Sequence, residues 1–319
     1  MRQRRMATVL AAAVFGAALC GAEATAAAKI GLRLRLKKGQ SYTLRQTAEQ
    51  MITQTLMGRK IQIEQRIGMG FLLEVQDVGA DGVAAVKTTI QSIRYKMKSQ
   101  FAVIEYDSAK PPETIPLPAR GFAAMVGQSF TMQLTDLGSV KKIQGGAAML
   151  EQAIKKSGLP DGPAREAMKT TVKNQFGDEA FRQDMEKLTR IYPAVPVGIG
   201  DTWTQKLAVT KGFPIVYNNT LTLKGRADGV ATIAAEAKFS PNEAAGPVKL
   251  GGMTVRYRLS GNQKGTIRVD EATGWMLGGK FAQELSGQFQ ISGAPGQGEG
   301  MTIPISVKGT LVIEGARKK

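Results

Sequence analysis

Short segments in which charged and apolar residues strictly alternate constrain the fold of this chain most. Leu32–Lys37, Ile93–Lys98 and Val255–Leu259 each place apolar side chains at every second position, with arginine or lysine between them. Successive side chains of a β-strand point to opposite faces, so this period predicts strands with one apolar and one solvated face. A parallel sheet covered on both faces would show continuous apolar runs, so we expect antiparallel sheets.

Turn-like motifs recur in nearly the same order in two halves of the chain, which predicts an internal duplication. Asp81-Gly82 and Asp228-Gly229 are typical of tight hairpin turns, because both residue types tolerate positive φ. Each precedes an Arg-Tyr-basic strand, at 94–96 or 256–258. A further motif, Gly-polar-Ser/Thr-aromatic-Thr, opens segments at 39–43, 127–131 and 200–204.

Between the two halves the residue spacing becomes helical. Phe181, Met185 and Leu188 lie four and three residues apart, as on one face of a helix. We therefore expect an α+β fold, mainly antiparallel β. It would consist of a first β-sheet unit at 29–146, a helical insert at 147–192 and a second, duplicated β-sheet unit at 193–319.

Residues 1–28 have the composition of an export signal. Arginines at positions 2, 4 and 5 precede the apolar stretch Ala7–Leu19, which is too short to span a bilayer, and small residues follow at 22–28. We expect cleavage after this segment and a periplasmic or secreted protein with no transmembrane span in the mature chain. Lipoprotein signals place a small residue before the acylated cysteine, and Leu19 precedes Cys20, so we do not expect a lipid anchor.

The chain contains one cysteine, Cys20, and no histidine. After cleavage neither residue type would remain, which excludes disulfides, thiol nucleophiles, imidazole bases and nearly all zinc or copper sites. The sequence therefore predicts a protein with no cofactor, no metal site and no catalytic residues of these classes.

The net charge of +17 indicates an anionic partner. An exported protein does not meet chromosomal DNA, so we expect no nucleic-acid partner but anionic lipids, lipopolysaccharide or wall polymers. The leading interpretation is a non-enzymatic periplasmic or envelope protein that binds such anionic components. The candidate anion-binding residues are the cations of the alternating segments: Arg33, Arg35, Lys37, Arg94, Lys96, Lys98, Arg256 and Arg258.

Two other functions fit parts of the sequence. Glu105 and Asp107 would project from one strand face, as the paired carboxylates of a hydrolase acting on envelope polysaccharide do. Alternatively, the chain carries an acyl chain in a methionine-lined pocket, since methionine forms adaptable apolar surfaces. The methionines of the first sheet unit would line that pocket: Met51, Met57, Met69, Met97, Met125 and Met132.

Three short motifs resemble those of a family of bacterial exported proteins of unknown function, many of them lipoprotein-like. They are Gly-Gln-Ser-Tyr at 39–42, Tyr-Asp-Ser at 106–108, and Tyr-Pro at 192–193 leading into Gly-Asp-Thr-Trp at 200–203. The resemblance covers nearly all of the chain after residue 28. It implies a location in the cell envelope and no particular reaction.

Overall fold

The computed structural model describes residues 28–56, 58–156, 162, 165, 166, 169, 177–210, 214–250, 253–293 and 300–318. The expected signal segment, with Cys20, lies outside these residues except for Ala28. The strands are β1 (Ser41–Leu56), β2 (Arg59–Val78), β3 (Ala84–Ser99), β4 (Val103–Asp107), β5 (Ser129–Leu134), β6 (Val140–Gln144), β7 (Thr202–Ala208), β8 (Ile215–Ala227), β9 (Val230–Pro241), β10 (Val248–Leu250), β11 (Met253–Asp270), β12 (Met276–Ser292) and β13 (Met301–Lys318). The helices are η1 (Leu117–Ala119), α1 (Arg120–Met125), α2 (Gly146–Lys156), α4 (Asp178–Thr189) and η2 (Glu243–Ala245).

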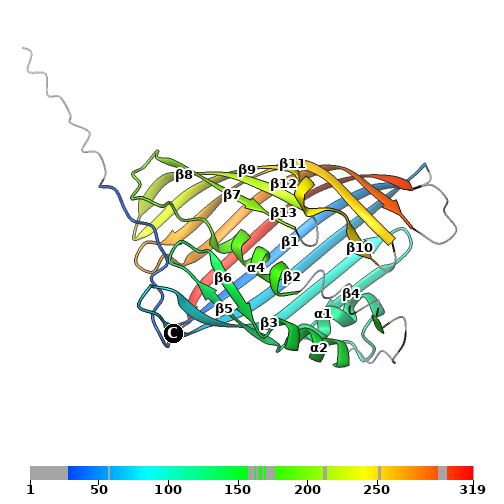
Figure 1. The fold of residues 1–319 in the computed structure, drawn as a ribbon, viewed down its shortest axis with the longest axis horizontal. Helices are drawn as coiled ribbons and strands as arrows, with labels where there is room; N and C mark the ends of the chain where they lie inside the picture. The colour runs from blue at the N-terminus through cyan, green and yellow to red at the C-terminus, as the bar shows by residue number, and fades with distance from the viewer. Residues whose placement is uncertain are drawn as a thin grey trace, which may run out of the picture.

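One antiparallel sheet of thirteen strands dominates the described part of the chain (Figure 1). Its order is β6-β5-β3-β2-β1-β13-β12-β11-β9-β8-β7, with β4 paired to β3 and β10 to β11. The predicted, mainly antiparallel β character is confirmed. β1 and β13 come from opposite halves of the chain and pair from Ser41–Lys318 to Gln54–Ile305. The strands on both sides of α2 and α4 therefore share one sheet.

The repeated motifs occupy partly corresponding places. Both Asp-Gly pairs form hairpin turns, one between β2 and β3 and one between β8 and β9, with Gly82 and Gly229 at positive φ. Arg94 lies on β3, directly after the first turn, but Arg256 lies on β11, beyond β9 and β10. β3 and β11 are each the second strand outward from the central β1–β13 pair, with the chain order reversed. The internal duplication therefore stays a prediction.

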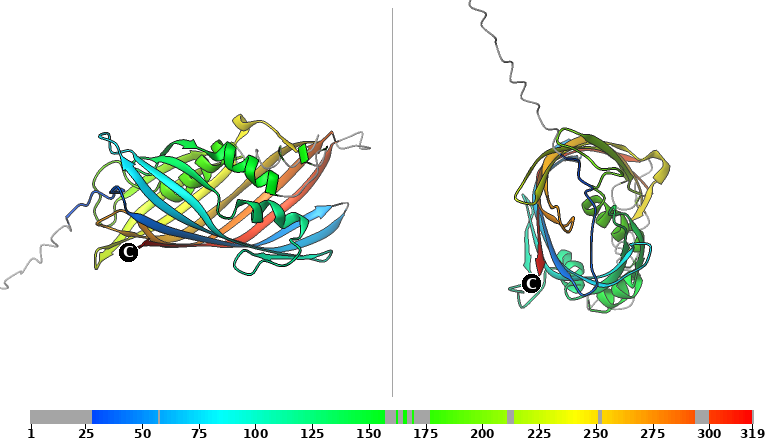
Figure 2. Two further views of the ribbon diagram at one scale, coloured as in Figure 1. Left: turned by 90° about the horizontal axis from the view of Figure 1, so that it is seen from below. Right: turned by 90° about the vertical axis from the view of Figure 1, so that its left-hand side faces the viewer.

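The alternating segment Leu32–Lys37 does not join the sheet, which corrects the strand expected there. Residues 28–40, here called the N-terminal strap, run across one end of the sheet and turn at Lys38-Gly39 (Figure 2). The backbone N–H of Leu34 donates to the carbonyl of Asp136, and that of Arg35 donates to the carbonyl of Thr273. These contacts tie the strap to two turns, so its alternation reflects one side packed on the core and one side facing water.

Helix α4 lies along the seam between the two edge strands of the curled sheet (Figure 2). On the β6 side, the Thr189 hydroxyl donates to the carbonyl of Gly138 at 2.6 Å. On the β7 side, the Trp203 indole donates to the carbonyl of Ile191 at 3.0 Å. The residues that predicted the helix from their spacing, Phe181, Met185 and Leu188, are all buried. Of the expected insert between α2 and α4, only residues 162, 165, 166, 169 and 177 are described.

The main hydrophobic core extends from the end of the sheet that the strap crosses to the helices α1 and α2, from which it includes Met125 and Leu150. At the strap end, Tyr42 and Trp275 stack with ring centroids 4.4 Å apart. The Tyr192 hydroxyl is buried and donates to the carbonyl of Gly274 at 2.6 Å. A smaller apolar cluster, which includes Phe239, Leu259 and Ile305, lies further along the strands. The concave face is thus solidly packed at the strap and less filled toward the opposite end.

Candidate ligand-binding cavity

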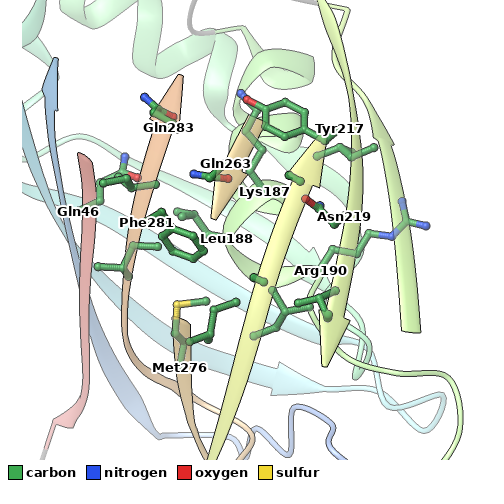
Figure 3. Close-up of a pocket in the computed structure, with 18 of the residues that line it drawn as sticks. Gln46, Lys187, Leu188, Arg190, Tyr217, Asn219, Gln263, Met276, Phe281 and Gln283 are labelled. Atoms are coloured by element: carbon green, nitrogen blue, oxygen red, sulfur yellow. The ribbon is translucent and has the colours of Figure 1, made fainter. Parts of the chain in front are cut away.

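A cavity of about 270 Å³ lies between α4 and the concave face of the sheet (Figure 3). The cavity lies next to the main core. Its walls come from elements that are distant in sequence. The lining residues are Gln46, Asp184, Lys187, Leu188, Arg190, Ile191, Leu207, Tyr217, Asn219, Leu221, Ala235, Ala237, Gln263, Ile267, Met276, Phe281, Gln283, Leu311 and Ile313.

The base of the cavity is apolar. Leu188 projects from α4 toward the sheet, while Ile267, Phe281 and Ile313 project from β11, β12 and β13. These strand residues are all buried, and they occupy the inward positions of the strands' two-residue alternation. The base can therefore accept a hydrocarbon group of a ligand.

A row of side-chain amides crosses the concave face next to this base. Each strand from β2 across to β7 contributes one residue to a continuous line of register partners. All of these residues are glutamine or asparagine except Gly309 of β13 and Ala237 of β9. We call these residues the amide row: Gln65, Gln50, Gln283, Gln263, Asn219 and Gln205. Three of them, Gln283, Gln263 and Asn219, line the cavity (Figure 3).

Most of these amides have unused hydrogen-bonding capacity. Gln205 donates to the carbonyl of Tyr192 at 3.0 Å. Among the residues that the structure describes, no hydrogen bond joins the side-chain amides of Gln263, Gln283 or Asn219 to another group. All three side chains are half-buried, so water can occupy their hydrogen-bonding sites when no ligand is bound. These three amides are thus available to bind the polar part of a ligand.

Lys187 of α4 adds a positive charge to the cavity wall. Its ammonium lies 2.7 Å from a carboxylate oxygen of Asp184 and 5.7 Å from the centre of the Tyr217 ring. Burial alone would lower the pKa of Lys187, but its interactions with Tyr217 and Asp184 outweigh burial, so the pKa is raised. Lys187 is therefore cationic at neutral pH, and Asp184 balances part of its charge.

The eight cations predicted from the sequence do not form one surface. Arg33, Arg35 and Lys37 belong to the strap, at one end of the sheet. Arg33 pairs with Asp136 at 2.8 Å and donates to the carbonyl of Ala194, while Arg35 donates to the carbonyl of Glu271. These two arginines hold the strap in place.

The other five predicted cations are exposed on the convex face, as their alternation indicated. Arg94, Lys96 and Lys98 lie on β3, and Arg256 and Arg258 lie on β11. Four strands separate β3 from β11, which is about 24 Å along the curved sheet at about 4.8 Å per step. The two groups therefore cannot contact one small anion together.

The paired carboxylates of the hydrolase hypothesis are also on the convex face. Glu105 lies 3.4 Å from the ammonium of Lys96, and Asp107 lies 2.9 Å from the guanidinium of Arg94. Neither residue lines the cavity. Because each carboxylate neutralises a neighbouring cation, the pair is explained by strand pairing between β3 and β4.

The methionine-lined pocket is not what the structure shows. Met276 is the one methionine of the cavity wall among the described residues, and it was not among those predicted. Met125 and Met132 are buried in the main core, Met51 is exposed, and Met57 lies outside the described residues. Met69 and Met97 pack against the main core.

No cluster of acidic residues suited to a metal ion occurs among the described residues. In the same part of the chain, no helix combines the length and the hydropathy that a membrane span requires.

Solved structures that match the chain share little sequence with it. A lipovitellin structure that concerns lipid–protein interactions has 8% identity and a TM-score of 0.45, and the match covers 89% of this chain but 25% of that one. The outer membrane protein OprG from Pseudomonas aeruginosa has 6% identity, a TM-score of 0.25, and coverage of 88% and 96%. OccK7 from the same organism has 7% identity, a TM-score of 0.20, and coverage of 88% and 100%. Likenesses at this level assign no function.

At the level of sequence, no curated protein matches the chain significantly. A family model does match residues 81–276, from the β2–β3 turn to the first residue of β12. This range is more than half of the 319 residues and includes α4 and much of the cavity wall. The chain therefore belongs to the family of unknown function DUF6263.

Proposed function

We propose that this protein is a non-enzymatic carrier that binds an amphipathic small molecule, with an acyl-like apolar part, in the cavity between α4 and the sheet. One observation carries the proposal: the unpaired amides of Gln263, Gln283 and Asn219 stand beside an apolar base inside the molecule. A ligand with a hydrocarbon part and a polar head would satisfy both surfaces at once.

The size and chemistry of the cavity support this class of ligand. Its volume of about 270 Å³ is near the lower limit of small-molecule pockets, which span about 300–1,000 Å³. Each methylene group removed from water contributes about 0.8 kcal/mol, so a short hydrocarbon segment supplies much of the binding free energy. The amides and Lys187 would then orient the head group.

A cavity-filling variant tests the proposal. Ala235 lines the cavity, whereas its neighbour Ala234 points to the opposite face of the same strand. We expect Ala235→Phe to weaken binding of a fluorescent fatty acid with a short acyl chain at least tenfold, and Ala234→Phe to leave it unchanged. If circular dichroism shows that both variants are folded and both bind the fatty acid equally, the fatty acid does not bind in this cavity and the proposal is wrong.

The cellular location belongs to the same proposal. The composition of residues 1–28 supports export to the periplasm or beyond, followed by release of the chain. N-terminal sequencing of protein from its native host would test this, with a mature start between residues 25 and 29 as the expected result. A diacylglycerol on Cys20 would contradict release.

We also propose that the two sheet units are duplicated: both Asp-Gly pairs form hairpins, although the Arg-Tyr strands follow in different order. Superposition of the two halves would test it. Binding of anionic envelope components by the predicted cations is supported by their exposure on β3 and β11, but Arg94 and Lys96 are already paired with acids.

A further inference from the structure

The end of the sheet opposite the strap has a distinct charge. We call it the open end and define it by residues 53–62, 98–103, 253–258, 286–293 and 300–306, so far as these are described. It contains the free ends of β1, β2, β12 and β13, which lie at the right in Figure 1. The strap and the main core close the other end.

Five exposed cations and no acidic residue occur among the described residues of the open end. The cations are Arg59, Lys60, Lys98, Arg256 and Arg258. None of them has an ion-pair or hydrogen-bond partner for its side chain within the described part of the chain. The nearest acidic side chains are Glu64 of β2, which lies opposite Lys98 in the β2–β3 register, Glu105 of β4, Glu284 of β12 and Glu243 of η2. Elsewhere on the sheet, by contrast, Arg66, Lys264 and Lys308 each pair with a glutamate.

An exposed aromatic side chain accompanies these cations. Phe101, in the turn between β3 and β4, is 74% exposed, and the adjacent Val103 is 63% exposed. Aromatic and aliphatic side chains beside lysine and arginine are typical of surfaces that enter the interface of a lipid bilayer. A soluble anionic partner would need the cations but would not need Phe101.

The concave face also reaches solvent at this end. Beyond the amide row most of its inward positions are apolar, with Gln54 and Ser99 as polar exceptions, and Ile61, Tyr257 and Phe289 are only half-buried there. The rings of Tyr257 and Phe289 meet edge to face at 4.9 Å. An apolar surface thus continues from the edge of the sheet toward the cavity, with no acidic residue along the described part of the open end.

We infer that the open end docks on an anionic phospholipid bilayer, with Phe101 inserted at the interface and the five cations on the lipid phosphates. The charge complementarity of a surface whose described residues include five cations and no acid favours this partner. The inference does not require a ligand in the cavity, so it can stand if the proposed carrier function fails. If both hold, the ligand enters from the bilayer along the apolar concave face.

Co-sedimentation with vesicles tests the inference. The wild type should bind vesicles of phosphatidylcholine with phosphatidylglycerol and should not bind phosphatidylcholine alone. The variant Arg59→Gln, Lys60→Gln, Arg256→Gln, Arg258→Gln should lose affinity at least tenfold. The matched control, Lys238→Gln, Lys264→Gln, Lys280→Gln, Lys308→Gln, removes the same charge from exposed positions outside the open end and should bind nearly as the wild type.

Three outcomes would overturn docking at the open end. Equal losses in the two quadruple variants would mean that net charge alone attracts the protein. Unchanged binding by Phe101→Ser at high salt, where screening removes most of the charge attraction, would exclude insertion of the ring. Equal affinity for soluble polyphosphate, again unaffected by Phe101→Ser, would indicate an acidic polymer as the partner instead.

Discussion

Glu186 of α4 accepts a hydrogen bond from the backbone N–H of Val140, the first residue of edge strand β6, at 3.1 Å. A helix side chain thus provides the acceptor that a neighbouring strand would provide within a sheet. The other carboxylate oxygen of Glu186 lies 2.9 Å from the guanidinium of Arg182, one helical turn earlier. Since Glu186 is buried, both contacts form away from water and fix α4 against the seam.

Removing the Glu186 carboxylate should loosen this seam. We expect Glu186→Ala to reduce the free energy of unfolding by about 2–3 kcal/mol, because it leaves a buried N–H donor and part of the Arg182 charge without a partner. Glu186→Gln is the matched control, since it keeps an acceptor for Val140 and loses only the ion pair. Urea unfolding measures both. A loss below about 0.5 kcal/mol for the alanine variant would contradict this account.

Because the Tyr192 hydroxyl is buried, the free energy of unfolding should decrease at alkaline pH. Burial raises the pKa of Tyr192 well above the usual value near 10. The unfolded chain releases this proton near pH 10 while the folded chain retains it, so the stability contributed by Tyr192 is complete below that pH and is lost as pH rises. The free energy of unfolding should fall by up to about 1.4 kcal/mol per pH unit above pH 10 from this group.

Tyr192→Phe separates the two effects of that hydroxyl. It removes the hydrogen bond to Gly274, which should cost about 1 kcal/mol at neutral pH. It should also make the alkaline slope shallower. Burial raises the pKa of Tyr42 as well, so some slope should remain. Urea titrations at neutral pH and at about pH 11 test this, and an unchanged slope would assign the effect to other groups.

Arg33 is expected to act in stability and not in anion binding. Its ion pair with Asp136 is partly exposed, so Arg33→Gln should cost about 0.5–1 kcal/mol in unfolding free energy. Lys37→Gln, on the exposed part of the same strap, should have no measurable effect. Both variants should bind anionic vesicles as the wild type does. A stronger effect of Lys37→Gln than of Arg33→Gln on vesicle binding would restore the strap as an anion site.

The two-residue period of the sequence was sufficient to predict antiparallel strands but insufficient to predict how they join. Ile93–Lys98 and Val255–Leu259 lie in β3 and β11, with their cations outward. Leu32–Lys37 has the same period but only crosses the end of the sheet. The pairing of Ser41 with Lys318 joins residues at opposite ends of the chain, and no local pattern encodes such a contact.

The cavity was harder to predict from the sequence than the strands were, because its walls come from α4 and from strands of both halves of the chain. One signal was present in the sequence. In β1, glutamines stand at 46, 50 and 54, in phase with the inward Leu44 and Ile52. Polar side chains on the buried phase of an amphipathic strand are unusual unless they serve a ligand or a partner. These inward glutamines would have indicated a binding site on the concave face. The outward cations form a more conspicuous pattern and directed the prediction to the convex face.

The amide row should lower stability in exchange for binding. Gln263 and Gln283 face each other across β11 and β12 without protein partners. Both side chains are half-buried, and replacing them by leucine adds apolar contacts on the concave face, so we expect the ligand-free double variant to be more stable than the wild type by about 1 kcal/mol. The same change should weaken binding of a fluorescent fatty acid, since the head group loses its hydrogen bonds. Gln288→Leu, on the opposite face of β12, is the control and should alter neither property. A double variant that is less stable, yet binds as well as the wild type, would mean that the two amides serve the fold and do not contact a ligand.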